Sequence, residues 1–364
     1  MSKPMAKKKK KKHSEENADS FIVEDDDFLP VEYCDDDYNP FMEPPDEPDD
    51  PEPDPHLVES LPHLSVVKDA LYHSPHTVYD ILRSKVYGNE EYLRTLSTIV
   101  WKAYNWQPPG GALLVVGPSG TGKTEAIRAL KSYGNITCVN AASLTPTGYR
   151  GPSLTSALRS LKFTRTDTDG RRNGRPICVW DEADKLFQKA QTAWNDSGLI
   201  FELLKLIEGG CFIDIGDDRK HIMIDPSDIT HIFLGSFSAL TDTKKSQPIG
   251  FNAVHEDEPK YLTEEQVMST LPPELQGRIS KTVMLNGFTE QDYRNIMLSE
   301  TYSPIKRISE DTDINIKISR ERAEKIASEA YQSKKGVRAM RSAVQAYVDD
   351  VLFNKPDTKY IYME

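Results

Sequence analysis

Gly117-Pro118-Ser119-Gly120-Thr121-Gly122-Lys123-Thr124 matches the pattern G-x-x-x-x-G-K-[ST] of phosphate-binding loops. Its glycines let consecutive backbone N–H groups turn around an anion, Lys123 reaches the terminal phosphates, and the Thr124 hydroxyl can ligate Mg²⁺. The apolar run 113–116 before it predicts a buried strand, and residues 125–131 predict a helix, with Glu125 at its start. We therefore expect the chain to bind a nucleoside triphosphate together with Mg²⁺.

The pattern around this loop is typical of an α/β domain. Short apolar segments predict strands at 112–116, 136–140, 177–180 and 230–235. Helices are expected between them, at 91–104, 153–163 and 198–207, which indicates a mostly parallel sheet covered on both faces. After Thr282–Leu285 the pattern predicts helices only, at 290–301, 320–332 and 337–353. The expected domains are a large α/β domain over 61–286 and a small all-α domain over 287–364.

Residues 1–60 differ from the rest in composition. The chain carries a net charge of −12, and residues 1–55 contain 7 lysines and 18 acidic residues. This segment opens with the run Lys7–Lys12 and continues through aspartate and proline clusters, so it lacks the apolar surface needed to fold alone. We expect a solvated tail. The alternative is that the lysine run attracts nucleic acid, although the neighbouring acidic block would compete for the same charges.

Several compositional features exclude other classes. The four cysteines at 34, 138, 178 and 211 form no Cys-x-x-Cys pair, so neither zinc nor a disulfide framework is expected. No apolar run approaches the roughly 20 residues of a membrane span, and no signal-peptide pattern follows the lysines. These features predict a cytoplasmic protein without a membrane partner.

A second phosphate-chemistry pattern lies at the end of the predicted strand 177–180. Here Asp181 and Glu182 follow the apolar residues Ile177-Cys178-Val179-Trp180, as in a Walker B sequence. Asp181 is expected to hold Mg²⁺, and Glu182 to orient and deprotonate the attacking water. The alternative is an acidic cap on the following helix.

With these motifs the chain resembles the AAA+ P-loop ATPases, and within them the ClpX unfoldase group. Six segments match in order over about residues 74–354. They are Ser74-Pro75-His76 with Val86-Tyr87-Gly88-Asn89-Glu90, Gly148-Tyr149-Arg150-Gly151, Asp181-Glu182-Ala183-Asp184-Lys185, Leu204-Lys205-Leu206-Ile207-Glu208-Gly209, Pro273-Glu274-Leu275-Gln276-Gly277-Arg278 and Gly336-Val337-Arg338. The resemblance implies an AAA+ large domain followed by a helical lid. ClpX proteins begin with a zinc-binding domain, which the acidic tail replaces here.

The resemblance also implies roles in the nucleotide site. Val86 and Tyr87 would line the adenine pocket, and Arg338 would sense the γ-phosphate from the lid. Arg278 would act in the site of the neighbouring subunit, which implies a homo-oligomeric ring, by family likeness a hexamer. Ser236, after the strand 230–235, is the best candidate for sensor 1.

Three loops would contact macromolecules. Tyr149 and Arg150 resemble the first pore loop, which grips polypeptide substrates, although the family usually has valine in place of Arg150. Arg219-Lys220-His221 resembles the basic loop at the pore entrance, with a polar hairpin tip as the equal alternative. Ile249-Gly250-Phe251 lies where ClpX carries its docking loop for the ClpP peptidase.

Three functions remain open at this stage. The leading one is an ATPase that unfolds proteins and threads them through a ring pore, delivering them to a ClpP-like peptidase without being a peptidase itself. The second is a remodelling chaperone that works without a peptidase. The third is a nucleic-acid-associated switch that binds through Lys7–Lys12, which the full set of hydrolytic residues disfavours.

Overall fold

Strand β1 (Ala112–Val116), directly before the glycine-rich loop, lies inside a five-stranded sheet. The computed structural model describes residues 72–145, 151–192, 197–216, 221–242 and 262–364, all within one unit of the chain. The order of strands is β2-β3-β6-β1-β7, and every neighbouring pair is parallel. The other four strands are β2 (Ile136–Asn140), β3 (Ile177–Asp181), β6 (Thr230–Gly235) and β7 (Ile279–Met284).

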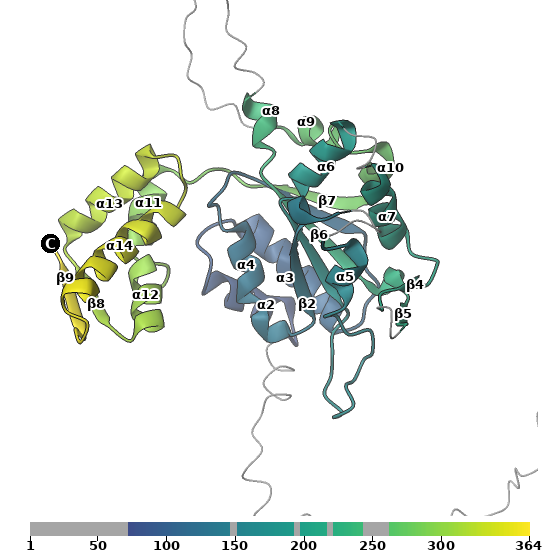
Figure 1. Cartoon of the computed structure of the whole chain (residues 1–364), viewed down its shortest axis with the longest axis horizontal. Coiled ribbons are helices and arrows are strands. Elements are labelled where there is room, and N and C mark those ends of the chain that lie inside the picture. Colours follow the sequence, from purple (N-terminus) through teal and green to yellow (C-terminus); the bar gives the residue numbers. More distant parts are fainter. Residues whose placement is uncertain (1–71, 146–150, 193–196, 217–220, 243–261) are drawn as a thin grey trace, which may run out of the picture. The chain divides into compact units, whose positions relative to one another are not determined.

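Alternate residues of the central strands point to two separate cores, as the pleat requires. Leu113 and Val115 of β1 pack in one core and Leu114 in the other. The first core is covered by α2 (Pro75–Arg83), α3 (Glu90–Tyr104) and α4 (Lys123–Ala129). The second is covered by α5 (Leu154–Leu158), α6 (Ala183–Thr192) and α7 (Ser197–Glu208) (Figure 1). Burial on both faces explains why the three inner strands β1, β3 and β6 are mostly apolar.

Short elements connect this framework. They are η1 (Lys131–Tyr133), η2 (Ala141–Ser143), β4 (Ile213–Asp214), β5 (Met223–Ile224), η3 (Pro226–Asp228), α8 (Ser238–Asp242), α9 (Glu264–Met268) and α10 (Pro273–Gln276). Strands β4 and β5 form an antiparallel hairpin. The helix expected at 153–163 is shorter, because α5 begins after the capping box at Ser153 and ends at Leu158.

The C-terminal part of the chain has its own apolar core. It consists of α11 (Glu290–Leu298), α12 (Pro304–Thr312), β8 (Asn315–Ile318), α13 (Arg320–Gln332), α14 (Arg338–Asn354) and β9 (Tyr360–Met363). We refer to it as the lid. The expected fold class, an AAA+ type α/β domain followed by a small helical domain, is confirmed by this architecture.

The expectation of helices alone in the lid is wrong in one respect. Strands β8 and β9 pair in parallel, with Ile316 opposite Ile361 and Ile318 opposite Met363. Ile316, Ile361 and Met363 are buried, whereas the adjacent strand residues Lys317 and Tyr362 are exposed. This alternation has the period of a strand, but each segment has only four residues and they lie far apart in the sequence. Helix α12 was also not predicted.

Within the described ranges, no helix is long and apolar enough to cross a bilayer.

A buried histidine links the neighbouring strands β3 and β6. Trp180 Nε1 donates to His231 Nδ1 at 3.1 Å, and both side chains are buried. Burial lowers the pKa of His231 to about 4. The neutral imidazole is therefore favoured in the folded protein, where a proton on Nδ1 would remove the acceptor that Trp180 uses.

This gives a prediction for stability against pH. In the unfolded chain the histidine has a pKa near 6.5. The contribution of neutral His231 to the free energy of unfolding is therefore fully present above that pH and is lost as the pH falls toward 4. Between pH 6.5 and 5 the loss from this group is about 2 kcal/mol. Urea unfolding at both pH values should show this loss in the wild type and a smaller one in His231→Gln. Equal pH dependence in both proteins would contradict the assignment.

Candidate nucleotide site

Three strand ends bring the predicted phosphate-chemistry residues to one edge of the sheet. The glycine-rich loop follows β1, Asp181 is the last residue of β3, and Ser236 follows β6. Because β6 lies between β1 and β3, the ends of these two strands are two strand spacings apart, about 10 Å. Residues of the loop, Asp181 and Ser236 line one cavity at these strand ends.

The glycine-rich loop has the backbone that only glycine adopts easily. Gly120 and Gly122 have φ values of +83° and +87°. Lys123 Nζ donates to the carbonyls of Gly117 and Pro118, and the Thr121 hydroxyl also donates to Pro118, which closes the loop on itself. The ammonium group of Lys123 is thus already held inside the curve of the loop.

Two residues at the start of α3 hold the glycine-rich loop in place. Asn89 Nδ2 donates to the carbonyl of Thr121 at 2.6 Å, and the buried Tyr92 hydroxyl donates to the carbonyl of Lys123 at 2.9 Å. Burial raises the pKa of Tyr92, so its hydroxyl remains a donor. The sequence pattern did not single out Tyr92, because its position looks like that of any core aromatic residue.

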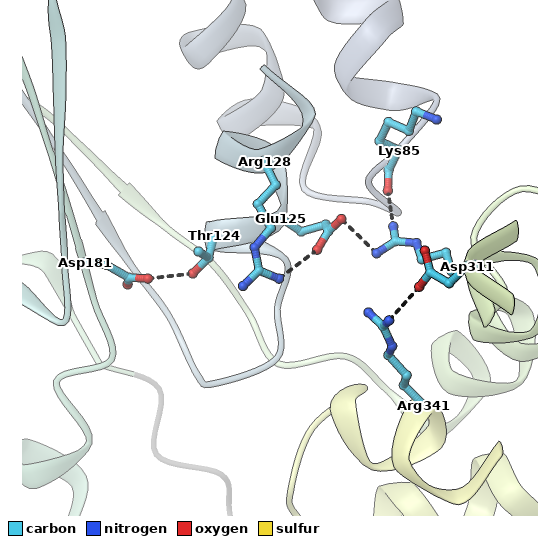
Figure 2. A network of polar contacts seen from close by, with 8 residues as sticks. Lys85, Thr124, Glu125, Arg128, Asp181, Asp311 and Arg341 are labelled. Carbon is cyan, nitrogen blue, oxygen red and sulfur yellow. Dashed lines mark hydrogen bonds and ion pairs between the residues drawn. The ribbon is translucent and has the colours of Figure 1, made fainter. Parts of the chain in front are cut away.

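The two predicted magnesium ligands lie against each other. Thr124 Oγ1 donates to Asp181 Oδ2 at 2.9 Å, as Figure 2 shows. A hydroxyl and a carboxylate so close together form a donor set that suits Mg²⁺.

Burial lowers the pKa of Lys123 to about 8. Arg338 acts in the same direction, and the carboxylates of Asp181 and Asp184 act against it. A bound phosphate would offset this cost by supplying negative charge.

Glu182 follows the Walker B strand in a strained conformation. Its φ is +57°, and its backbone N–H donates to Asp181 Oδ1 at 3.0 Å. A non-glycine residue in this region is uncommon and persists where the surroundings enforce it. Its side chain lines the same cavity as Lys123 and Thr124.

Asp184 orders the strand end that carries Ser236. The buried carboxylate accepts from the backbone N–H groups of Ser236 and Phe237 at 3.2 and 3.3 Å, and from the Ser236 hydroxyl at 3.3 Å. Ser236 lines the cavity between the loop and Asp181. The sequence placed Asp184 in a motif but did not show which residues it would contact.

The lid closes the other side of the cavity. Arg338 of the lid lines it together with Val86 and Tyr87, which lie between α2 and α3. Tyr87 donates to Asp292 Oδ1 at 3.0 Å, which fixes its ring against the lid. A Cβ added to Gly120 would come within 2.9 Å of the Gly336 Cα, so the loop and the start of α14 approach too closely for side chains.

Four basic residues of the cavity were not predicted from the sequence. They are Lys85, Arg128, Arg307 and Arg341. Their side chains add basic groups to the cavity beyond those of the Walker motifs. They match no local motif, because their positions are set by packing between distant segments.

Arg278 lies at the opposite edge of the sheet. Its carbonyl accepts from the N–H of Ala112, the first residue of β1, and its guanidinium pairs with Glu208 at 2.9 Å. The glycine-rich loop begins at the other end of β1, about 16 Å away. Arg278 is therefore not part of the nucleotide cavity of its own chain.

The predicted macromolecular contacts fall mostly outside the described residues. These are Tyr149, Arg150, Arg219, Lys220, Ile249, Gly250 and Phe251. His221 is described, and its Nδ1 lies 2.5 Å from Asp214 Oδ2 beside the β4–β5 hairpin. The hydrogen bond to Asp214 raises the pKa of His221.

Comparisons with known proteins agree with this geometry. Residues 108–282 match the model of an AAA domain (Cdc48 subfamily), and residues 288–360 match the C-terminal, D2-small domain of ClpB protein. The chain is similar to the ATP-dependent Clp protease ATP-binding subunit ClpX of Treponema denticola, with 28% identity over 79% of this chain and 78% of the relative.

Two further ClpX proteins show the same extent of similarity. The ClpX of Borrelia duttonii is 26% identical over 79% of this chain and 76% of its own length. The ClpX of Porphyromonas gingivalis is 25% identical over 78% of each chain. Residues 108–282 thus form an AAA domain and a small helical domain follows, in a chain that is similar to ClpX proteins over about four fifths of its length.

Proposed function

We propose that this chain hydrolyses ATP and uses the energy to unfold protein substrates, which it threads through the pore of a ring. The observation that carries the ATPase part is one cavity lined by Lys123, Thr124, Asp181, Glu182 and Arg338. The AAA domain match and the names of the ClpX relatives support the same activity.

Each of these residues has a distinct part in the reaction. Lys123 and Arg338 bind the phosphate oxygens and stabilise the charge that develops on them. Glu182 accepts a proton from the attacking water. The water oxygen forms a bond to the γ-phosphorus while the bond from that phosphorus to the β–γ bridging oxygen breaks, which gives ADP and phosphate. Ser236, held by Asp184, faces the same space. Thr124 and Asp181 would hold Mg²⁺, which neutralises phosphate charge when bound.

The position of Arg278 supports assembly of several copies. Because it lies at the edge of the sheet opposite its own nucleotide cavity, it can serve catalysis only in another copy. A head-to-tail arrangement that repeats this contact closes into a ring. A hexameric ring follows from the likeness to ClpX alone.

The coupling to protein unfolding rests on the loop around Tyr149. A tyrosine next to glycine, with Arg150 beside it, suits a surface that grips extended polypeptide as the ring moves. His221, with Arg219 and Lys220, would contribute positive charge at the entrance. We place the protein in the cytoplasm, as a protein of this function would be.

Replacing Glu182 tests the catalytic assignment. Glu182→Gln keeps the size and polarity of the side chain but cannot accept the proton, so we expect ATP turnover to fall at least about a hundredfold. Binding of a fluorescent ATP analogue should remain within about twofold, because Lys123 and the loop are intact. Residual turnover near the wild-type rate would show that another group is the base.

The relatives are named as ATP-binding subunits of the Clp protease. We propose that this chain binds a ClpP-like peptidase through Ile249-Gly250-Phe251 and delivers unfolded substrates to it. Work without a peptidase is the alternative.

The double variant Ile249→Glu/Phe251→Glu distinguishes these functions. Charges in place of two apolar anchors should abolish ATP-dependent degradation of a folded fluorescent substrate in the presence of the host's ClpP. The ATPase rate and unfolding without peptidase should stay at wild-type levels. If the wild type unfolds the substrate yet never supports its degradation, the chain is a remodelling chaperone.

A further inference from the structure

One lid arginine joins three segments around the nucleotide cavity. Arg307, on α12, places its Nη1 2.7 Å from Glu125 Oε1 on α4, and its Nη2 donates to the carbonyl of Lys85 at 3.0 Å. Lys85 directly precedes Val86 of the cavity wall. Arg307 therefore touches the helix after the glycine-rich loop and the segment before α3 at the same time.

The partner of Arg307 is adjacent to the magnesium ligands. Glu125 follows Thr124, whose hydroxyl donates to Asp181 (Figure 2). Both Glu125 and Arg307 are about 30% exposed, so their attraction is screened less than that of a surface pair. Arg128 also contacts Glu125, but at 3.6 Å and with a more exposed side chain, so Arg307 is the main partner.

A second ion pair carries this connection through the lid. Asp311, one turn after Arg307 on α12, accepts from Arg341 Nη2 at 3.0 Å (Figure 2). Arg341 lies on α14 one turn after Arg338, which lines the cavity. The two pairs thus link Glu125 to the helix that presents Arg338. The Arg341 and Asp311 side chains are 50% and 64% exposed, and α12 and α14 are also held together by the shared lid core.

We propose that Arg307 is a positioning residue that latches the lid to α4 and so holds Arg338 over the bound nucleotide. The inference rests on the proposed function, since it concerns the same ATP site. Arg307 also lines the nucleotide cavity, so the effect of its pairing with Glu125 must be separated from any direct contact with the phosphates. Loss of the latch should weaken nucleotide binding more than it slows the chemical step.

The test is a double-mutant cycle on the full-length chain. Arg307→Gln and Glu125→Gln should each raise the Kd of a fluorescent ATP analogue and the KM for ATP about fivefold, with kcat within about twofold. The double variant should be no weaker than either single variant, because one interaction is removed in each case. Arg307→Lys, which keeps the charge facing Glu125, should recover most of the affinity.

Arg320→Gln is the matched control. It removes the same charge from the lid, and its partner Glu324 lies on the same helix, away from the cavity. Its Kd and KM should equal those of the wild type, and circular dichroism should show that all variants fold.

Two results would overturn the latch. Wild-type Kd and KM in Arg307→Gln, or additive effects in the double variant, would show that Arg307 and Glu125 do not act as a pair. A wild-type protein that neither binds nor hydrolyses ATP would instead refute the proposed function, and the latch with it.

Discussion

The parallel sheet imposes the constraint on which the rest of the structure depends. Every strand ends at the same edge, so the glycine-rich loop, Asp181 and Ser236 meet although more than 100 residues separate the first from the last. With β6 between β1 and β3, residues that follow all three strands line one cavity. The same parallel order sends Arg278, before β7, to the opposite edge. Arg278 and the nucleotide cavity of the same chain therefore lie at opposite edges of the sheet.

Close approach between the loop and the lid is the second requirement. Glycine at positions 120 and 336 lets the backbones come together where a Cβ would collide, and both residues have positive φ values. Around this contact, Lys123 is kept in a buried position that lowers its pKa, while the Arg307–Glu125 pair ties the lid to α4. A site that keeps an ammonium group buried at such cost is suited to an anionic ligand.

The success of prediction from sequence followed the range of the interactions. The residues 117–124 and the pair Asp181–Glu182 are local patterns, so their place at strand ends could be predicted. The lid strands could not, because β8 and β9 are four residues each and pair over a long separation. The support from Tyr92 and the latch at Arg307 also depend on packing between distant segments. The pore and peptidase loops remain predictions from resemblance.

The most direct test of the account asks whether two copies share one site. Lys123→Ala should abolish ATP hydrolysis by removing the phosphate-binding ammonium, and Arg278→Ala should abolish it by removing the neighbour's contribution. Mixing the two inactive proteins should restore part of the wild-type ATPase rate, because some interfaces then pair an intact cavity with an intact Arg278. Full activity of Arg278→Ala alone, or no recovery from mixtures shown to co-assemble, would contradict the account.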